Sequence, residues 1–116
     1  MSDKTLKMTM LLDFFGELLT EKQRSYFEMY YNEDLSLSEI AENEGISRQG
    51  VRDIIMRAEN TLLQMEEKTG LLRRFEERRE IIREMETELA RLIQLCRGEA
   101  RERAESLQKR LQDLKG

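Results

Sequence analysis

One short stretch of the sequence carries side chains that are suited to contacting nucleic acid. Residues 47–57 read SRQGVRDIIMR. From the N-terminus of a helix, arginine and glutamine side chains reach base edges or phosphates, and a serine beside free backbone amides can hold a phosphate. Gly50 would leave room for a nucleic-acid backbone to approach. We therefore predict a nucleic-acid-binding surface that consists of Ser47, Arg48, Gln49, Arg52 and Arg57.

No pattern in the sequence indicates catalysis or metal binding. Histidine, the commonest general base, is absent, and the single cysteine, Cys96, cannot form a disulfide within the chain. A zinc site therefore lacks the ligands that it needs. Neither a phosphate-binding loop nor a dinucleotide-binding glycine turn is present. We expect a protein that is not an enzyme and that has no cofactor and no metal.

The predicted binding surface lies on the second helix of a predicted helix-turn-helix motif, residues 36–58. Ser36 caps the first helix, and Glu39 completes a capping box with it. Gly45 can take the left-handed conformation that ends this helix in a sharp turn. Ser47 caps the second helix. The apolar face of the second helix follows helical spacing and consists of Val51, Ile54, Ile55, Ala58 and Leu62.

Two further helices are expected before the motif. The first spans residues 6–19 and is apolar on two faces, which favours burial on two sides. The second begins after Thr20, which forms a capping box with Gln23. Because the chain has no proline and no segment with the alternation of a strand, we predict an all-α fold. The second helix carries an aromatic face that we expect in the core, namely Tyr26, Phe27, Tyr30 and Tyr31.

The remainder of the chain, residues 70–116, is predicted to be one long charged helix. The motif's second helix should run to about Lys68 and stop at the break formed by Thr69 and Gly70. We therefore divide the chain into a helical domain, residues 1–69, and a C-terminal extension, residues 70–116. In the extension, apolar residues form a heptad seam that a four-residue insertion near Gly98 interrupts, which predicts a stutter or a kink.

A narrow apolar seam on a long helix usually pairs with another helix. We therefore expect a homodimer with two-fold symmetry. The alternative is a chain that bends at Gly98 and packs on its own first helix. The seam consists of Phe75, Ile82, Met85, Leu89, Leu92, Cys96, Ala100, Ala104, Leu107, Leu111 and Leu114.

The distribution of charge argues against tight binding of nucleic acid. The chain has 20 basic and 24 acidic residues. Residues 20–69 hold six basic and eleven acidic residues, whereas residues 70–116 hold twelve and ten. Because phosphate neutralisation supplies most of the affinity for nucleic acid, we expect binding to DNA or RNA to be weak.

The sequence also bears on where the protein works. It has no apolar run of 18 residues, and its first residues do not have the pattern of a targeting segment. We expect a cytoplasmic protein without membrane insertion.

Residues 19–62, LTEKQRSYFEMYYNEDLSLSEIAENEGISRQGVRDIIMRAENTL, resemble region 4 of bacterial sigma factors, which reads promoter DNA through such a motif. The segments MLLDFFGELLTEKQRSYFEMYY and SRQGVRDIIMRAE resemble the YlxM-type family more closely. These are small bacterial helix-turn-helix proteins associated with the signal recognition particle. The resemblance covers about residues 6–75. It implies an all-helical fold and a regulatory role in the signal recognition particle pathway, inferred from gene neighbourhood.

Two functions remain open on the sequence. By analogy with sigma region 4, DNA-contacting residues would lie at Arg48, Gln49 and Arg52, which favours a regulator that binds nucleic acid as a homodimer. The alternative is a protein-interaction adaptor of the signal recognition particle that kept the fold and lost DNA binding. It would contact the particle, its RNA or its GTPase.

Overall fold

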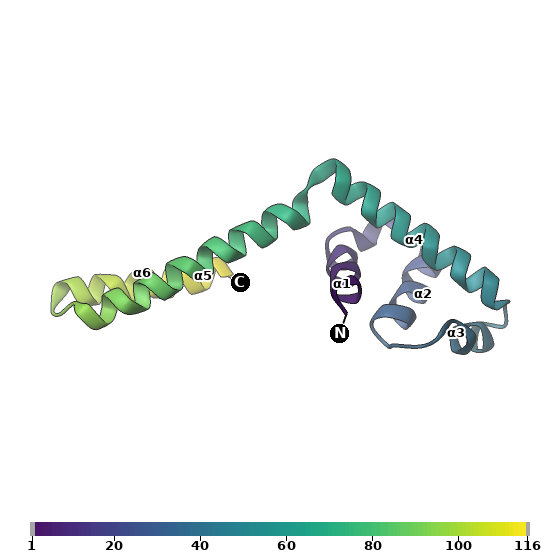
Figure 1. Ribbon diagram of the computed structural model, residues 1–116, viewed down its shortest axis with the longest axis horizontal. Helices are drawn as coiled ribbons and strands as arrows, with labels where there is room; N and C mark the ends of the chain where they lie inside the picture. Colours follow the sequence, from purple (N-terminus) through teal and green to yellow (C-terminus); the bar gives the residue numbers. More distant parts are fainter. Residues whose placement is uncertain (1, 116) are drawn as a thin grey trace. The chain divides into compact units, whose positions relative to one another are not determined.

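The computed structural model describes residues 2–115, and these form helices without any strand (Figure 1). The predicted all-α class is therefore confirmed. The chain divides into two compact units after Leu72, and each is described by itself. The elements are α1 (Asp3–Phe15), the short 3₁₀ helix η1 (Gly16–Leu18), α2 (Glu21–Tyr31), α3 (Leu37–Glu44), α4 (Arg48–Thr69), α5 (Leu71–Leu95) and α6 (Glu99–Lys115).

Helix caps define the elements of the first unit much as the sequence predicts. Thr20 and Ser36 each form the predicted capping box, with Gln23 and Glu39 respectively. Gly45 adopts the left-handed conformation, with φ of 67°, and ends α3. Because these caps satisfy backbone groups that a helix end leaves unpaired, they fix the boundaries of α2 and α3 locally.

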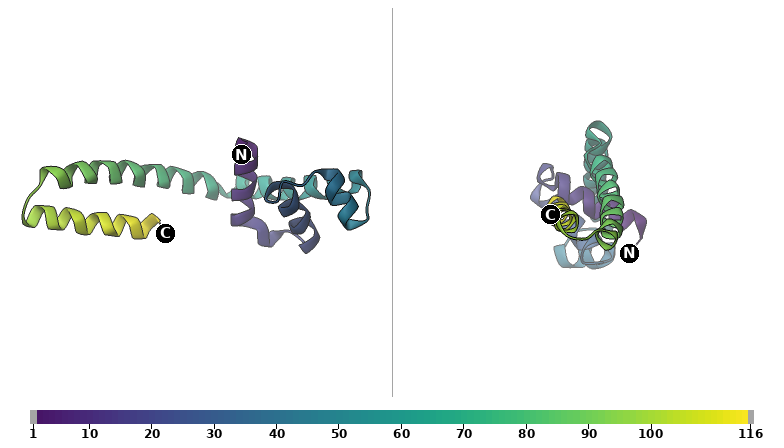
Figure 2. Two further views of the ribbon diagram at one scale, coloured as in Figure 1. Left: turned by 90° about the horizontal axis from the view of Figure 1, so that it is seen from below. Right: turned by 90° about the vertical axis from the view of Figure 1, so that its left-hand side faces the viewer.

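Helix α4 is the central element of the first unit, and α1, α2 and α3 all contact it. The left panel of Figure 2 shows α1 crossing α4. Burying one large apolar side chain fully stabilises a fold by roughly 1.5–3 kcal/mol. The largest fully buried side chains, which come from all four helices, are Leu11, Phe27, Ile40, Val51 and Leu62.

The first helix differs in its bounds from the predicted range of residues 6–19. It begins at Asp3, because the Ser2 side chain accepts a hydrogen bond from the Thr5 amide at 3.1 Å. It ends at Phe15, and the chain continues as η1. One face is buried as expected, but on the second face Phe14 keeps 39% of its surface exposed.

The first turn of α5 belongs to the first unit. Gly70 has a left-handed conformation and ends α4, one residue after the predicted break begins. Leu72 is only 3% exposed and lies in the core of the first unit. Its backbone N–H donates a hydrogen bond to the Glu66 carboxylate at 2.8 Å.

The second unit is a helical hairpin, so the prediction of one long C-terminal helix is wrong. Helix α5 ends at Leu95, and α6 runs back beside it in the opposite direction (Figure 2). Gly98 has a φ of 64°, which a side chain would disfavour, and its carbonyl accepts the first hydrogen bond of α6 from Glu102. The bend predicted at Gly98 therefore exists, but it is a complete reversal, and the returning segment packs on α5.

No helix within residues 2–115 is both long enough and apolar enough to cross a membrane.

Candidate nucleic-acid interface

The five residues predicted to contact nucleic acid are all exposed. Ser47 is the N-cap of α4, and three of the others lie in its first turns. Arg48, Gln49 and Arg52 share one side of its first turns. Arg57 lies nine residues after Arg48, and about 100° per residue places it half a turn away around the helix. The structure therefore places Arg48, Gln49 and Arg52 on the first turns of α4, and Arg57 further along the helix, on the side opposite Arg48.

The Ser47 side chain caps the N-terminus of α4. Its hydroxyl oxygen accepts a hydrogen bond from the Gly50 amide at 3.0 Å, which makes Ser47 the N-cap of α4. A β-carbon built on Gly50 would lie 3.1 Å from this oxygen and 3.6 Å from the Ile46 side chain. The missing side chain of Gly50 therefore leaves room for the cap.

An acidic neighbour engages Gln49. Its Nε2 donates a hydrogen bond to the Asp53 carboxylate at 2.9 Å, one turn further along α4. An amide that reads adenine needs its nitrogen and its oxygen together, so this bond must break before Gln49 can read a base. On the preceding helix, Glu39, Glu42 and Glu44 are exposed as well. The motif therefore exposes carboxylates as well as arginines, which lowers the expected affinity for phosphate.

A cavity of about 320 Å³ adjoins Arg52, and the sequence did not predict it. The Tyr31 hydroxyl donates a hydrogen bond to the Glu59 carboxylate in its wall. Burial, followed by the hydrogen bond and the negative charge of Glu59, raises the pKa of Tyr31 above its ordinary value. The tyrosine and the glutamate are 28 residues apart, so no local pattern could pair them. The cavity is lined by Lys4, Tyr30, Tyr31, Leu37, Arg52, Ile55, Met56 and Glu59.

Tyr31→Phe should make the stability of the first unit less sensitive to alkaline pH. The folded state keeps the Tyr31 proton at pH values where the unfolded chain loses it, near the ordinary pKa of about 10. The stabilisation is fully present below pH 10 and is lost as the pH rises above it. We therefore expect the wild-type free energy of unfolding to fall more steeply above pH 10 than that of Tyr31→Phe, measured by urea unfolding at several pH values. Tyr30→Phe, which leaves the bond to Glu59 intact, should behave like the wild type.

In the described range, residues 2–115, no three His, Cys, Asp or Glu side chains are grouped so that they could hold a metal ion.

Comparison with known proteins gives the chain its family. The profile of the UPF0122 family, described as "Putative helix-turn-helix protein, YlxM / p13 like", matches residues 2–99. UPF0122 protein GK1195 of Geobacillus kaustophilus is 50% identical over 91 residues, which are 78% of this chain and 83% of that protein. UPF0122 protein BH2485 of Halalkalibacterium halodurans is 53% identical over 85 residues, which are 73% and 78% of the two chains.

A third relative, UPF0122 protein lin1916 of Listeria innocua, is 45% identical over 91 residues, 78% of this chain and 83% of that protein. The family match includes the whole of α3 and α4, where the structure has its helix-turn-helix. The chain therefore belongs to the UPF0122 family of YlxM- and p13-like helix-turn-helix proteins.

Proposed function

We propose that this protein is a non-enzymatic, cytoplasmic regulator that binds DNA or RNA weakly through the first turns of α4. The observation that carries the proposal is the exposed group of Arg48, Gln49 and Arg52 directly after a capped helix start. Second helices of such motifs enter the major groove with their N-terminal residues against base edges. Arg57 would contact a phosphate at most, because it lies further along α4 and away from the N-terminal turns.

The proposed setting is the signal recognition particle pathway. It rests on the resemblance of residues 10–31 and 47–59 to the YlxM-type family, for which that association is inferred from gene neighbourhood. Components of the particle are accordingly the proposed partners.

A second candidate function is a protein-interaction adaptor of the same particle that has lost DNA binding. Two observations favour it. Residues 20–69 hold eleven acidic and six basic residues. In addition, Asp53 engages Gln49, the one amide side chain of the proposed surface.

Fluorescence anisotropy with a labelled DNA duplex and with the RNA of the particle tests the regulator, at several salt concentrations. We expect weak binding near physiological salt, and about a three- to tenfold loss of affinity in Arg52→Ala, with a smaller salt slope. Arg24→Ala is the matched control, because it removes an exposed arginine of the first unit that is paired with Glu28. It should leave the affinity nearly unchanged.

The two functions give opposite results. Absence of binding to both nucleic acids, together with saturable binding to a protein of the particle, would support the adaptor and refute the regulator. Tight, sequence-specific binding that is lost in Arg52→Ala would refute the adaptor.

A further inference from the structure

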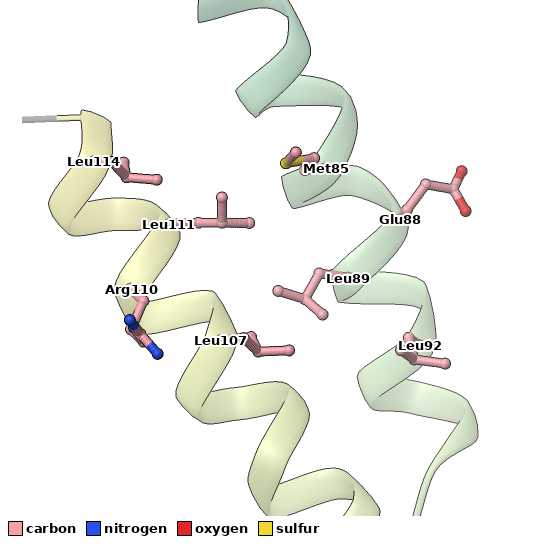
Figure 3. Close-up of a pocket in the computed structure, with 8 residues that line it drawn as sticks. All are labelled: Met85, Glu88, Leu89, Leu92, Leu107, Arg110, Leu111 and Leu114. Atoms are coloured by element: carbon pink, nitrogen blue, oxygen red, sulfur yellow. The ribbon is translucent and has the colours of Figure 1, made fainter.

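Each unit has a concave surface, and the two surfaces differ in chemistry. In the second unit, a groove of about 690 Å³ lies between α5 and α6 (Figure 3). Six apolar side chains line this groove together with Glu88 and Arg110, and none of the lining residues is aromatic. The cavity beside Arg52 in the first unit instead combines aromatic, apolar and charged side chains, so it can recognise a ligand by its chemistry.

The cavity beside Arg52 has the size of a small-ligand site. Its volume of about 320 Å³ lies at the lower end of the range for such sites, roughly 300–1,000 Å³. Side chains from α1, α2, α3 and α4 line it. A second cavity, of about 460 Å³, shares Lys4, Tyr30 and Tyr31 with it, so the two cavities adjoin.

Two cations border the cavity. Lys4 and Arg52 are both exposed, and neither forms an ion pair among the described residues 2–115. They attract an anionic group and repel a cationic ligand. The carboxylates of Asp34 and Glu39 line the adjoining cavity, so an anionic group is favoured on the side of Arg52.

Glu59 gives the wall of the cavity a hydrogen-bond acceptor. Its Oε1 accepts the hydrogen bond from the Tyr31 hydroxyl, which orients the carboxylate. Because a carboxylate has about four acceptor positions, Glu59 can accept further hydrogen bonds from a ligand. The negative charge strengthens a bond from a neutral N–H of the ligand and repels a carbonyl oxygen or an anion at the same place.

Tyr30 supplies an aromatic wall. It is half-buried and lines both cavities. Its ring meets the ring of Tyr31 edge to face, with the centroids 4.9 Å apart. Leu37 and Ile55 add apolar surface to the same cavity. A flat ring can stack against such a wall, because bases stack readily on aromatic side chains.

We propose that this cavity binds one unstacked nucleotide of a single strand, with a base that carries an exocyclic amino group. Lys4 and Arg52 require an anionic group of the ligand, which the phosphate supplies. Tyr30 suits the flat base, and Glu59 accepts from its amino group. The inference rests on the proposed binding of nucleic acid and specifies which part of a strand the first unit reads.

The spacing on α4 fits a nucleotide. Arg52 and Glu59 are seven residues apart, which places them on the same face of α4 and about 10 Å apart along its axis. This separation is comparable to that between the phosphate of a nucleotide and the pairing edge of its base. One nucleotide can therefore contact both side chains at once.

Single strands of cytosine and of uracil test the proposal, because both bases are pyrimidines and both strands carry the same charge. Cytosine offers its amino group to Glu59, whereas uracil offers one N–H between two carbonyl oxygens, which the carboxylate repels. We expect labelled oligo(C) to bind the full chain about five- to tenfold more tightly than oligo(U) of equal length, measured by fluorescence anisotropy at low salt and slightly alkaline pH. Equal affinities, or a preference for oligo(U), would overturn the inference.

Glu59→Gln tests the acceptor. The amide keeps an oxygen for the Tyr31 hydroxyl, loses the charge and gains a donor for a uracil carbonyl, so the ratio of the two affinities should fall to about one. Glu67→Gln is the matched control, since it removes an exposed carboxylate of α4 that does not line the cavity. It should leave the ratio unchanged. A wild-type ratio in Glu59→Gln would refute the role of Glu59.

Tyr30 variants and a DNA duplex separate this inference from the proposed function. Tyr30→Leu should weaken oligo(C) binding by about tenfold, whereas Tyr30→Phe, which keeps the ring, should bind like the wild type. A duplex keeps its bases stacked, so Tyr30→Leu should not change duplex affinity and Arg48→Ala should lower it. Duplex binding without any preference for oligo(C) would overturn the cavity site alone. Absence of binding to every strand and duplex would overturn the cavity site and the proposed function together.

Discussion

Phe27→Ala should lower the free energy of unfolding of the first unit by roughly 3–5 kcal/mol. Phe27 is fully buried, and its ring lies 4.7 Å from the ring of Tyr31, centroid to centroid. The substitution removes the transfer free energy of the ring and leaves a cavity that a close-packed core can only partly close. Domains of this size are stable by about 5–15 kcal/mol, so the variant should be close to unfolding.

The tyrosines make this measurement specific. The chain has three tyrosines and no tryptophan, and all three tyrosines lie on α2. Tyrosine fluorescence during urea unfolding therefore reports on the first unit and not on the hairpin. Phe14→Ala is the matched control, since Phe14 belongs to the same unit but is 39% exposed, and it should cost less than about 1.5 kcal/mol. Equal losses in the two variants would show that the core is not packed as described.

Gly45→Val should destabilise the first unit by about 2 kcal/mol through its backbone alone. Gly45 has a φ of 67° and a ψ of 32°, in the left-handed region, where a β-branched residue is strained. Apart from the two chain neighbours of Gly45, no atom lies within 4 Å of the position that a β-carbon would occupy, so the β-carbon itself has space. The cost would therefore arise mainly in the backbone of the turn between α3 and α4.

Because the cost is conformational, it should follow how well each residue tolerates that conformation. Asparagine enters the left-handed region more readily than other non-glycine residues, so Gly45→Asn should lose least, Gly45→Ala more and Gly45→Val most. Thermal melting followed by tyrosine fluorescence would rank the three variants. A wild-type melting temperature in Gly45→Val would contradict the assigned turn, and a loss in Gly45→Asn as large as in Gly45→Val would show that space, and not backbone strain, decides.

Features that depend on a few neighbouring residues could be predicted from the sequence. The capping boxes at Thr20 and Ser36 and the helix stops at Gly45 and Gly70 are formed by residues within one turn of each other. Apolar spacing likewise identified the buried face of α4, where Val51, Ile55, Ala58 and Leu62 are buried. The caps and the glycine stops are confirmed because they depend on local energies, and the buried face is confirmed because apolar side chains at helical spacing favour burial.

Features that depend on distant contacts could not be predicted. A glycine in a heptad pattern fits a stutter, a kink or a full turn, and only the structure shows that Gly98 lies in a full turn between α5 and α6. The hydrogen bond between Tyr31 of α2 and Glu59 of α4 joins two residues that are 28 positions apart in the sequence. In the candidate site, the bond from Gln49 to Asp53 and the contact of Gly50 with the Ser47 cap are local, but they depend on side-chain positions that the residue types alone do not fix.

The burial of Leu72 bears on how this chain can change during evolution. The helix boundary lies at Gly70, but the core of the first unit ends at Leu72, inside the next helix. A recombination event that exchanged the C-terminal segment at the glycine would replace the core side chain of Leu72 along with it. An exchange after Leu72 would keep that core intact, so we expect the first turn of α5 to be inherited together with α4.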